Sequence, residues 1–98
     1  MPLLYVLAGL TLFGTLPAIA QAQKPVVVID PAHGGEDTGC IGIDKVVEKD
    51  ITLAMAKRLK QELNSSGTCR VVLTREGDET LSVEQRKKII TEIGRAHV

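Results

Sequence analysis

The apolar positions of the chain form two strand-like runs with an amphipathic segment between them. Residues 26–29 are four consecutive β-branched residues, which predicts a strand buried on both faces of a parallel sheet. From Glu48 to Leu63 apolar residues recur every four positions and polar residues fill the other face, which predicts a helix lying on a sheet. Residues 71–74, Val-Val-Leu-Thr, predict a second strand. This order is typical of a βαβ unit with parallel strands.

Turn and capping residues set the ends of these elements. Pro31 ends the first strand, and residues 64–67 carry the turn and C-cap residues that end the helix. Ser82 and Gln85 form a capping box, so a second helix is expected to begin near Val83. Two strands and two helices enclose only a thin core. We therefore expect an α/β fold, the N-terminal half of a three-layer domain with a mostly parallel sheet flanked by helices.

The opening of the chain has the pattern of a secretory signal. Residues 1–23 contain no charged side chain, and residues 3–16 form an apolar run shorter than the roughly 20 residues of a membrane span. Small residues in A-x-A spacing follow Pro17, as at a signal peptidase site, although no Lys or Arg precedes the run. We expect a signal peptide over residues 1–22; an uncleaved anchor or a buried helix is the alternative. The product would be exported, periplasmic or extracellular, without stable membrane association after cleavage.

The composition gives no sign of a nucleic-acid or membrane partner and contains few aromatic residues and cysteines. The 98 residues carry 12 basic and 12 acidic side chains, so a formal charge of zero gives no electrostatic case for nucleic acid or an anionic membrane. Tyr5 and Phe13 are the only aromatic residues, and both precede the charged part of the chain. Cys40 and Cys69 are expected to remain unpaired, because they flank opposite edges of the parallel strand pair.

The glycine-rich loop after the first strand carries the candidate chemistry. His33 follows the carboxyl end of that strand, where functional groups of open parallel sheets gather. Glu48 lies where the first helix begins, at the same edge. A His and a Glu meeting there have the ligand types of a catalytic zinc site. The alternatives are a solvated His in a loop and a Glu that pairs with the helix dipole.

Four ordered blocks of sequence resemble one enzyme family. The blocks lie in three runs, VVVIDPAHGGEDTGCIG, VVEKDITLAMAKRLKQEL and VVLTREGDETLSVEQR, the last of which holds two of them. They are similar to the zinc-dependent N-acetylmuramoyl-L-alanine amidases of the amidase-3 type, whose wording is near IDPGHGG, E-K-x-x-x-L-x-x-A-x-x-L, V-x-x-T-R-x-x-D and L-x-x-R. The resemblance spans residues 26–90, with Ala32 in place of the commoner Gly.

The resemblance implies a peptidoglycan hydrolase that cuts the amide between N-acetylmuramic acid and the L-alanine of the stem peptide. It implies Zn²⁺ as cofactor, with His33 and Glu48 as the first two ligands, and peptidoglycan as partner; it points to no particular activator protein. Residues 23–92 would be the N-terminal part of the catalytic domain. The family's third His ligand and its catalytic Glu belong to later segments, so no catalytic residue is expected in this chain, which alone would be inactive.

Structural roles are expected first for several polar residues in or beside these blocks. Asp30 either orients the His33 loop or caps the strand end. A solvated turn with a surface ion pair is expected for Arg75 and Asp78, with substrate contact as the alternative. A structural salt bridge is expected for Arg86, with ligand binding as the alternative. Glu36 and Asp37 are expected in an exposed loop rather than at the mouth of a metal site.

The end of the chain departs from the family pattern. Residues 93–98 match one translation of a common sequencing-library adapter, so we expect a non-native tail, with a natural frameshift or an assembly break as the alternative. We reject His97 as the third ligand, because it lies only 11 residues after Arg86 and lacks the Ser and Asn neighbours of the family's motif. Two other functions remain open: a catalytically dead peptidoglycan-binding module and a non-functional gene fragment. The first would need aromatic side chains for sugar stacking, and residues after 23 contain none.

Overall fold

The computed structural model describes residues 24–96, so the expected signal peptide and His97 lie outside the described residues. In chain order the elements are β1 (Val26–Ile29), the 3-10 turn η1 (Ile43–Lys45), α3 (Glu48–Ser66), β2 (Arg70–Leu73) and α4 (Val83–Ala96). β1 and β2 pair in parallel, with Val26 opposite Arg70 and Ile29 opposite Leu73. The expected α/β class and the order strand, helix, strand, helix are confirmed.

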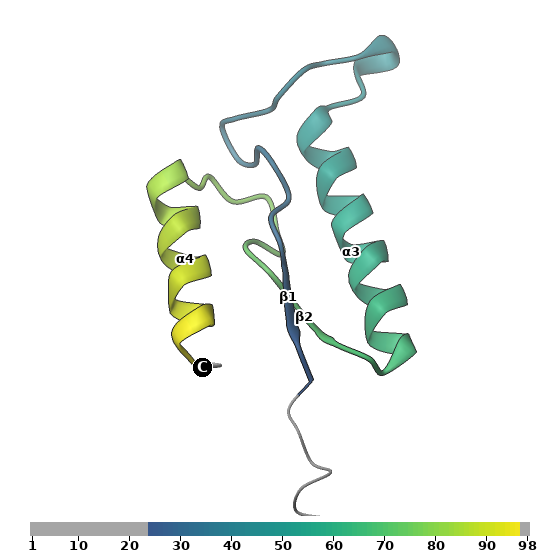
Figure 1. Cartoon of the computed structure of the whole chain (residues 1–98). Helices are drawn as coiled ribbons and strands as arrows, with labels where there is room; N and C mark the ends of the chain where they lie inside the picture. The colour runs from purple at the N-terminus through teal and green to yellow at the C-terminus, as the bar shows by residue number, and fades with distance from the viewer. Residues whose placement is uncertain (1–23, 97–98) are drawn as a thin grey trace, which may run out of the picture.

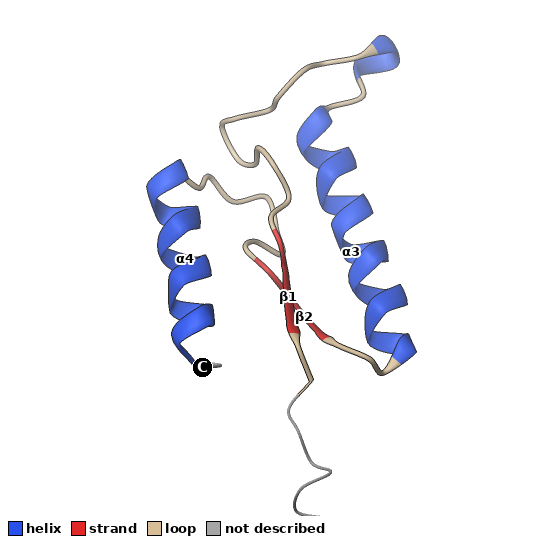
Figure 2. Ribbon diagram, in the orientation of Figure 1, coloured by secondary structure: helices blue, strands red, loops and turns tan. Residues whose placement is uncertain are grey.

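The two strands lie between the two helices. Figures 1 and 2 show the sheet nearly edge-on, with α3 on one side and α4 on the other. The buried core lies on the α3 side, where burial of apolar surface stabilises the fold. It consists of Ala56, Val71 and Leu73, with Ile29, Leu63 and Cys69 packed against it.

The helix ends follow the sequence signals. α3 begins at Glu48 and ends at a left-handed Gly67, with a φ of 71°, whose N–H donates to the Asn64 carbonyl at 3.2 Å. At the start of α4 the Ser82 N–H donates to Gln85 Oε1 at 2.8 Å, and the Gln85 N–H donates to Ser82 Oγ at 3.1 Å. The C-cap and the capping box are thereby confirmed. α4 continues to Ala96, and the non-native origin of residues 93–98 stays a prediction.

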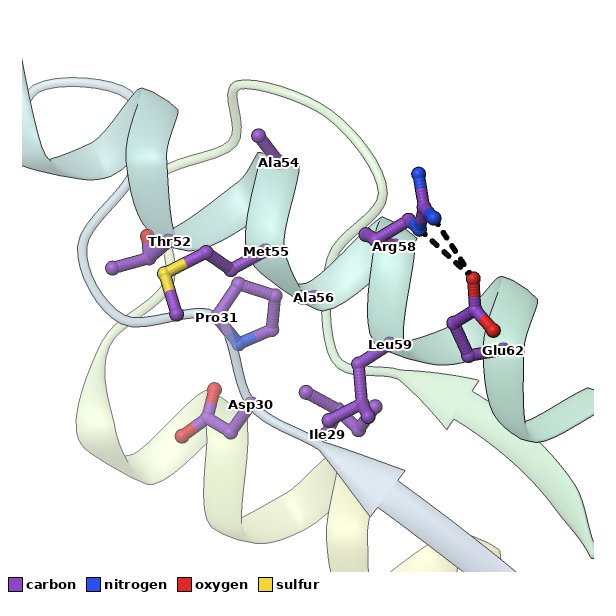
Figure 3. A pocket seen from close by; sticks show the side chains of 10 residues that line it. All are labelled: Ile29, Asp30, Pro31, Thr52, Ala54, Met55, Ala56, Arg58, Leu59 and Glu62. Atoms are coloured by element: carbon purple, nitrogen blue, oxygen red, sulfur yellow. Dashed lines mark hydrogen bonds and ion pairs between the residues drawn. The ribbon is translucent and has the colours of Figure 1, made fainter.

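The expectation that the first strand is buried on both faces is wrong for the described residues. Val27 is 37% exposed, because α3 packs mainly against β2 and leaves the side chains of β1 partly uncovered. An open apolar groove of about 740 Å³ lies between β1 and α3 (Figure 3). Ile29 and Pro31 line it on one side, and Met55 and Leu59 on the other.

Two further features concern the expectations about membranes and thiols. Among residues 24–96, no helix is long and apolar enough to span a bilayer. Both thiols are free: Cys40 is exposed in the loop after β1, and Cys69 is half-buried just before β2.

Candidate metal centre

The loop after β1 folds back on itself directly after His33. The Gly34 N–H donates to the Asp37 carbonyl at 2.7 Å, and the Asp37 N–H donates to the Gly34 carbonyl at 3.0 Å. Gly34 and Gly35 have positive φ values, which suit this tight reversal. The reversal brings residue 37 back beside the imidazole of His33.

The same loop then caps the start of α3. The N–H groups of Glu48 and Lys49, which have no partner within the helix, donate to the carbonyls of Cys40 at 2.9 Å and Thr38 at 3.0 Å. These bonds replace a side-chain cap, which α3 does not have. The loop therefore delivers the beginning of α3, with Glu48, to His33.

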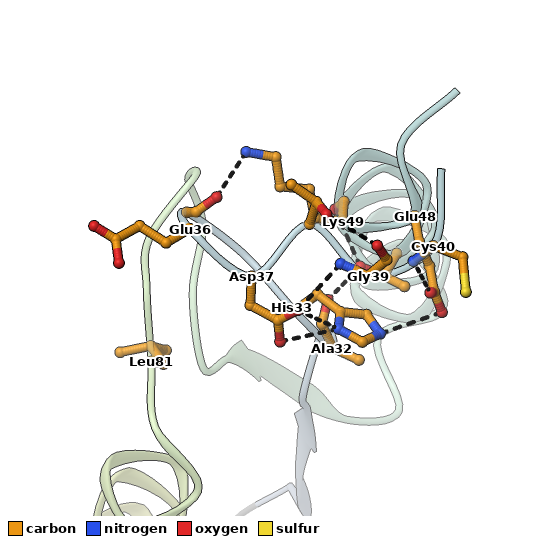
Figure 4. Close-up of polar contacts among 12 residues, drawn as sticks. Ala32, His33, Glu36, Asp37, Gly39, Cys40, Glu48, Lys49 and Leu81 are labelled. Atoms are coloured by element: carbon orange, nitrogen blue, oxygen red, sulfur yellow. Dashed lines mark hydrogen bonds and ion pairs between the residues drawn. The ribbon is translucent and has the colours of Figure 1, made fainter. Parts of the chain in front are cut away.

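The structure brings the two predicted ligands together. His33 Nε2 lies 3.3 Å from Glu48 Oε2. On the other side of the ring, His33 Nδ1 lies 3.0 Å from each carboxylate oxygen of Asp37. The Cys40 N–H donates to Glu48 Oε1 at 2.8 Å. Figure 4 shows the imidazole between the carboxylates of Asp37 and Glu48.

Electrostatics favours ionised carboxylates around this ring. The hydrogen bond with Asp37 raises the pKa of His33, and the charges of Asp37 and Glu48 add to this effect against the opposing influence of desolvation. The Cys40 N–H and then His33 lower the pKa of Glu48. The pKa of Asp37 is lowered by His33 and by the Gly39 N–H.

The donor set fits two ligands of a divalent metal. When the imidazole is neutral and donates Nδ1–H to Asp37, the lone pair of Nε2 is left on the side of Glu48 Oε2. A carboxylate that accepts the second N–H of a ligating His is a recurring arrangement in metal sites. In the part of the chain that the structure describes, no third His, Cys, Asp or Glu joins these two as a ligand group.

Replacing Asp37 by Asn is expected to lower the pKa of His33 toward the ordinary value of about 6.5. The neutral amide loses the charge that stabilises the imidazolium. It also holds the Nδ1–H tautomer less firmly, so metal affinity should fall about 10- to 100-fold at a pH where His33 is neutral in both proteins. An NMR titration of the ring and a metal competition assay measure the two effects. Glu36→Gln, a change at an exposed neighbour, is the control; equal shifts in both variants would contradict the prediction.

The expected solvated turn is wrong for Arg75. This side chain is buried, with the residue only 2% exposed, and its guanidinium donates to carbonyls instead of forming a surface ion pair. Asp78 does form an ion pair, with Lys49 Nζ at 2.9 Å, and it accepts the Gly35 N–H at 2.7 Å. Lys49 and the Gly35 N–H lower the pKa of Asp78.

Asp30 links the ends of the two strands. Its carboxylate accepts a hydrogen bond from Thr74 Oγ1 at 2.7 Å and pairs with Arg86, which confirms the expected structural salt bridge of Arg86. Burial acts to raise the pKa of Asp30, but the Thr74 hydroxyl and the Arg86 guanidinium outweigh it, so the pKa lies below its usual value. Asp30 therefore binds Thr74 at the strand end, and it is linked to the His33 loop through Arg86, which also donates to the His33 carbonyl.

Asp37 is the residue of this site that sequence reasoning placed elsewhere. Its side chain is exposed, as expected of a loop, yet it contacts the His33 ring. The available signal was its position four residues after His33 across two glycines, because such a reversal returns the chain to the same place. Glu36 is exposed as expected, and its N–H donates to Thr80 Oγ1 at 3.0 Å.

These features define a parallel α/β protein whose polar site lies at the carboxyl ends of its strands. Its family follows from sequence: the Amidase_3 family model, described as N-acetylmuramoyl-L-alanine amidase, matches residues 27–98. The chain belongs to this family.

Curated relatives and solved structures agree with that assignment. N-acetylmuramoyl-L-alanine amidase AmiC of Escherichia coli O6:H1 is 38% identical over 74 residues, which are 74% of this chain and 18% of that protein. The catalytic domain of CwlV, an N-acetylmuramoyl-L-alanine amidase of Bacillus (Paenibacillus) polymyxa, is 41% identical with a TM-score of 0.67, over 71% of this chain and 40% of that one. An N-acetylmuramoyl-L-alanine amidase of Clostridium difficile 630 is 31% identical with a TM-score of 0.71, over 74% and 40%. The chain thus spans less than half of these relatives.

Proposed function

We propose that this chain supplies His33 and Glu48 as two ligands of a Zn²⁺ ion in an exported peptidoglycan hydrolase. The enzyme would cleave the amide between N-acetylmuramic acid and the L-alanine of the stem peptide. The observation that carries the proposal is the 3.3 Å approach of His33 Nε2 to Glu48 Oε2 at the carboxyl ends of parallel strands. It supports this function because the relatives of the chain are named N-acetylmuramoyl-L-alanine amidases.

The residues of this chain prepare both donors. Asp37 accepts Nδ1–H and so directs the lone pair of Nε2 away from itself, toward Glu48. The Cys40 N–H holds Oε1 of Glu48, which leaves Oε2 for the ion. His33 and Glu48 would hold Zn²⁺, which would supply the Lewis acid that polarises the scissile carbonyl and lowers the pKa of a water molecule. The carboxylates of Asp37 and Glu48 stay ionised at neutral pH, because the pKa of each is lowered, so the negative charge that attracts the cation is maintained.

The 98-residue polypeptide by itself is proposed to hold Zn²⁺ weakly and to be inactive. Catalytic zinc sites have three protein ligands and one open position. Residues 24–96 bring two such donors together. The third ligand and the proton-transferring Glu are proposed to come from further segments of the catalytic domain, as the resemblance implies.

Digestion of purified peptidoglycan tests the proposed function. The full-length product of the gene that encodes this chain should release stem peptides and create new amino-terminal L-alanine. A chelator should abolish the release and added Zn²⁺ should restore it, whereas the 98-residue polypeptide should release nothing. New reducing sugar ends without new alanine amino groups would refute the amidase, and retention on peptidoglycan without release would favour a binding module.

A further inference from the structure

Two guanidinium groups hold the backbone at His33. Arg75 donates from Nε to the Pro31 carbonyl at 3.1 Å and from Nη2 to the Ala32 carbonyl at 3.0 Å. Arg86 donates from Nη1 to the Pro31 carbonyl at 2.9 Å and from Nη2 to the carbonyl of His33 itself at 2.8 Å. Three consecutive carbonyls, of residues 31–33, therefore accept N–H groups from arginine.

Arg75 also reaches the segment that carries Glu48. Its Nη2 lies 3.1 Å from the Lys49 carbonyl and 3.2 Å from Thr52 Oγ1, both in the first turns of α3. Thr52 Oγ1 in turn donates to the Ala32 carbonyl at 2.7 Å. A single buried side chain thus connects the residue before His33 with the residue after Glu48.

The backbone of His33 needs such support. Its φ is 65°, in the left-handed region that residues other than glycine rarely adopt. A residue persists in such a conformation only when its surroundings over-determine it, and such residues cluster at functional sites. The arginine bonds act on both sides of this φ, because they fix the carbonyls of Ala32 and of His33.

We propose that Arg75 and Arg86 are positioning residues that hold His33 in the left-handed conformation and so direct its Nε2 toward Glu48. The proposal rests on the proposed function only for the identity of the ion at Nε2. The planar fork of guanidinium is essential to this role, since the compact ammonium of lysine cannot supply N–H groups to two separate carbonyls in the same geometry.

Lysine substitutions in the full-length gene product test the proposal. In the metal-free protein, the amide–Hα coupling and the intraresidue NOE of His33 report its φ by NMR. Competition with a chromophoric chelator measures Zn²⁺ affinity. In Arg86→Lys and Arg75→Lys we expect the φ of His33 to leave the left-handed region and Zn²⁺ affinity to fall on the order of 10-fold or more. Arg58→Lys is the matched control, because Arg58 is an exposed arginine of α3 that pairs with Glu62.

A core variant separates positioning from general destabilisation. Val71→Ala should lower the melting temperature because it leaves a cavity in the core, and in the folded protein it should change neither the φ of His33 nor the Zn²⁺ affinity. Folded lysine variants that keep a positive φ and wild-type affinity would overturn the proposal; if Arg75→Lys does not fold, the less buried Arg86 decides. A wild-type protein with positive φ at His33 and no Zn²⁺ binding would refute the proposed function, while the φ values alone would still decide the positioning role.

Discussion

Replacing Glu48 by Gln should reduce the Zn²⁺ affinity of the full-length protein by a factor on the order of 100 or more, and amidase activity with it. Loss of a group that only orients a ligand costs about 10- to 100-fold, so loss of a ligand itself should cost at least as much. The amide oxygen of Gln can still accept the Cys40 N–H, so the loop should remain in place while the charge facing His33 is lost.

Zinc content by atomic absorption and release of stem peptides measure the effect of Glu48→Gln. Glu62→Gln is the matched control, because Glu62 lies on the same helix, is exposed and pairs only with Arg58 in the described structure. The control should keep its metal and its activity. A Glu48→Gln protein that retains stoichiometric zinc would remove Glu48 from the ligand set.

Gly39→Ala is the second change with a large expected effect, because it places a methyl group between the two candidate ligands. A Cβ on residue 39 would lie 2.6 Å from Glu48 Oε1 and 2.8 Å from His33 Cδ2, closer than nonbonded atoms allow. The φ of Gly39 is also 66°, which costs an alanine about 1–2 kcal/mol. We expect His33 and Glu48 to be pushed apart and metal affinity to fall at least 10-fold, as measured by chelator competition.

Gly67→Ala separates the two costs of that substitution. Gly67 has a similar φ of 71°, but nothing lies within 4 Å of the position that its Cβ would take. Thermal unfolding should show a loss of stability in both variants, larger in Gly39→Ala because the steric clash adds to the conformational cost, whereas only Gly39→Ala should lose metal affinity. Unchanged affinity in Gly39→Ala would mean that the His33–Glu48 geometry does not depend on this close approach.

Local signals were sufficient to predict the elements and the meeting of the two candidate ligands. Each signal for an element lies within the segment whose structure it determines, so its structural consequence can be predicted from the sequence. These signals are the β-branched run of residues 26–29, the apolar period from Glu48 to Leu63 and the caps at Gly67 and Ser82. The convergence of His33 with Glu48 then follows from the strand–helix–strand order, because α3 has to begin near the sheet edge at which β1 ends in order to run back to the start of the parallel strand β2.

The surroundings of the site could not be predicted in the same way. Arg75 stands among polar residues in a turn, which resembles a solvated segment, and its burial depends on backbone carbonyls more than 40 positions earlier in the chain. The sequence cannot show which backbone carbonyl will accept a hydrogen bond, since every residue has one. The β-branched run predicts that β1 is buried on both faces, but the burial of a strand depends on which strand its neighbouring helix packs against. Here α3 packs mainly against β2, which leaves β1 partly exposed.

The distance along the chain between the His33 loop and its two arginines sets an order of assembly. The ribosome makes β1 and the loop first, and α3 and β2 follow, but the Arg86 guanidinium that holds the His33 carbonyl comes 53 positions after it. A nascent chain halted before residue 75 would contain both candidate ligands, His33 and Glu48, but neither Arg75 nor Arg86. On the positioning role proposed above, the geometry at His33 can be completed only after Arg86, in the first turn of α4, has been synthesised.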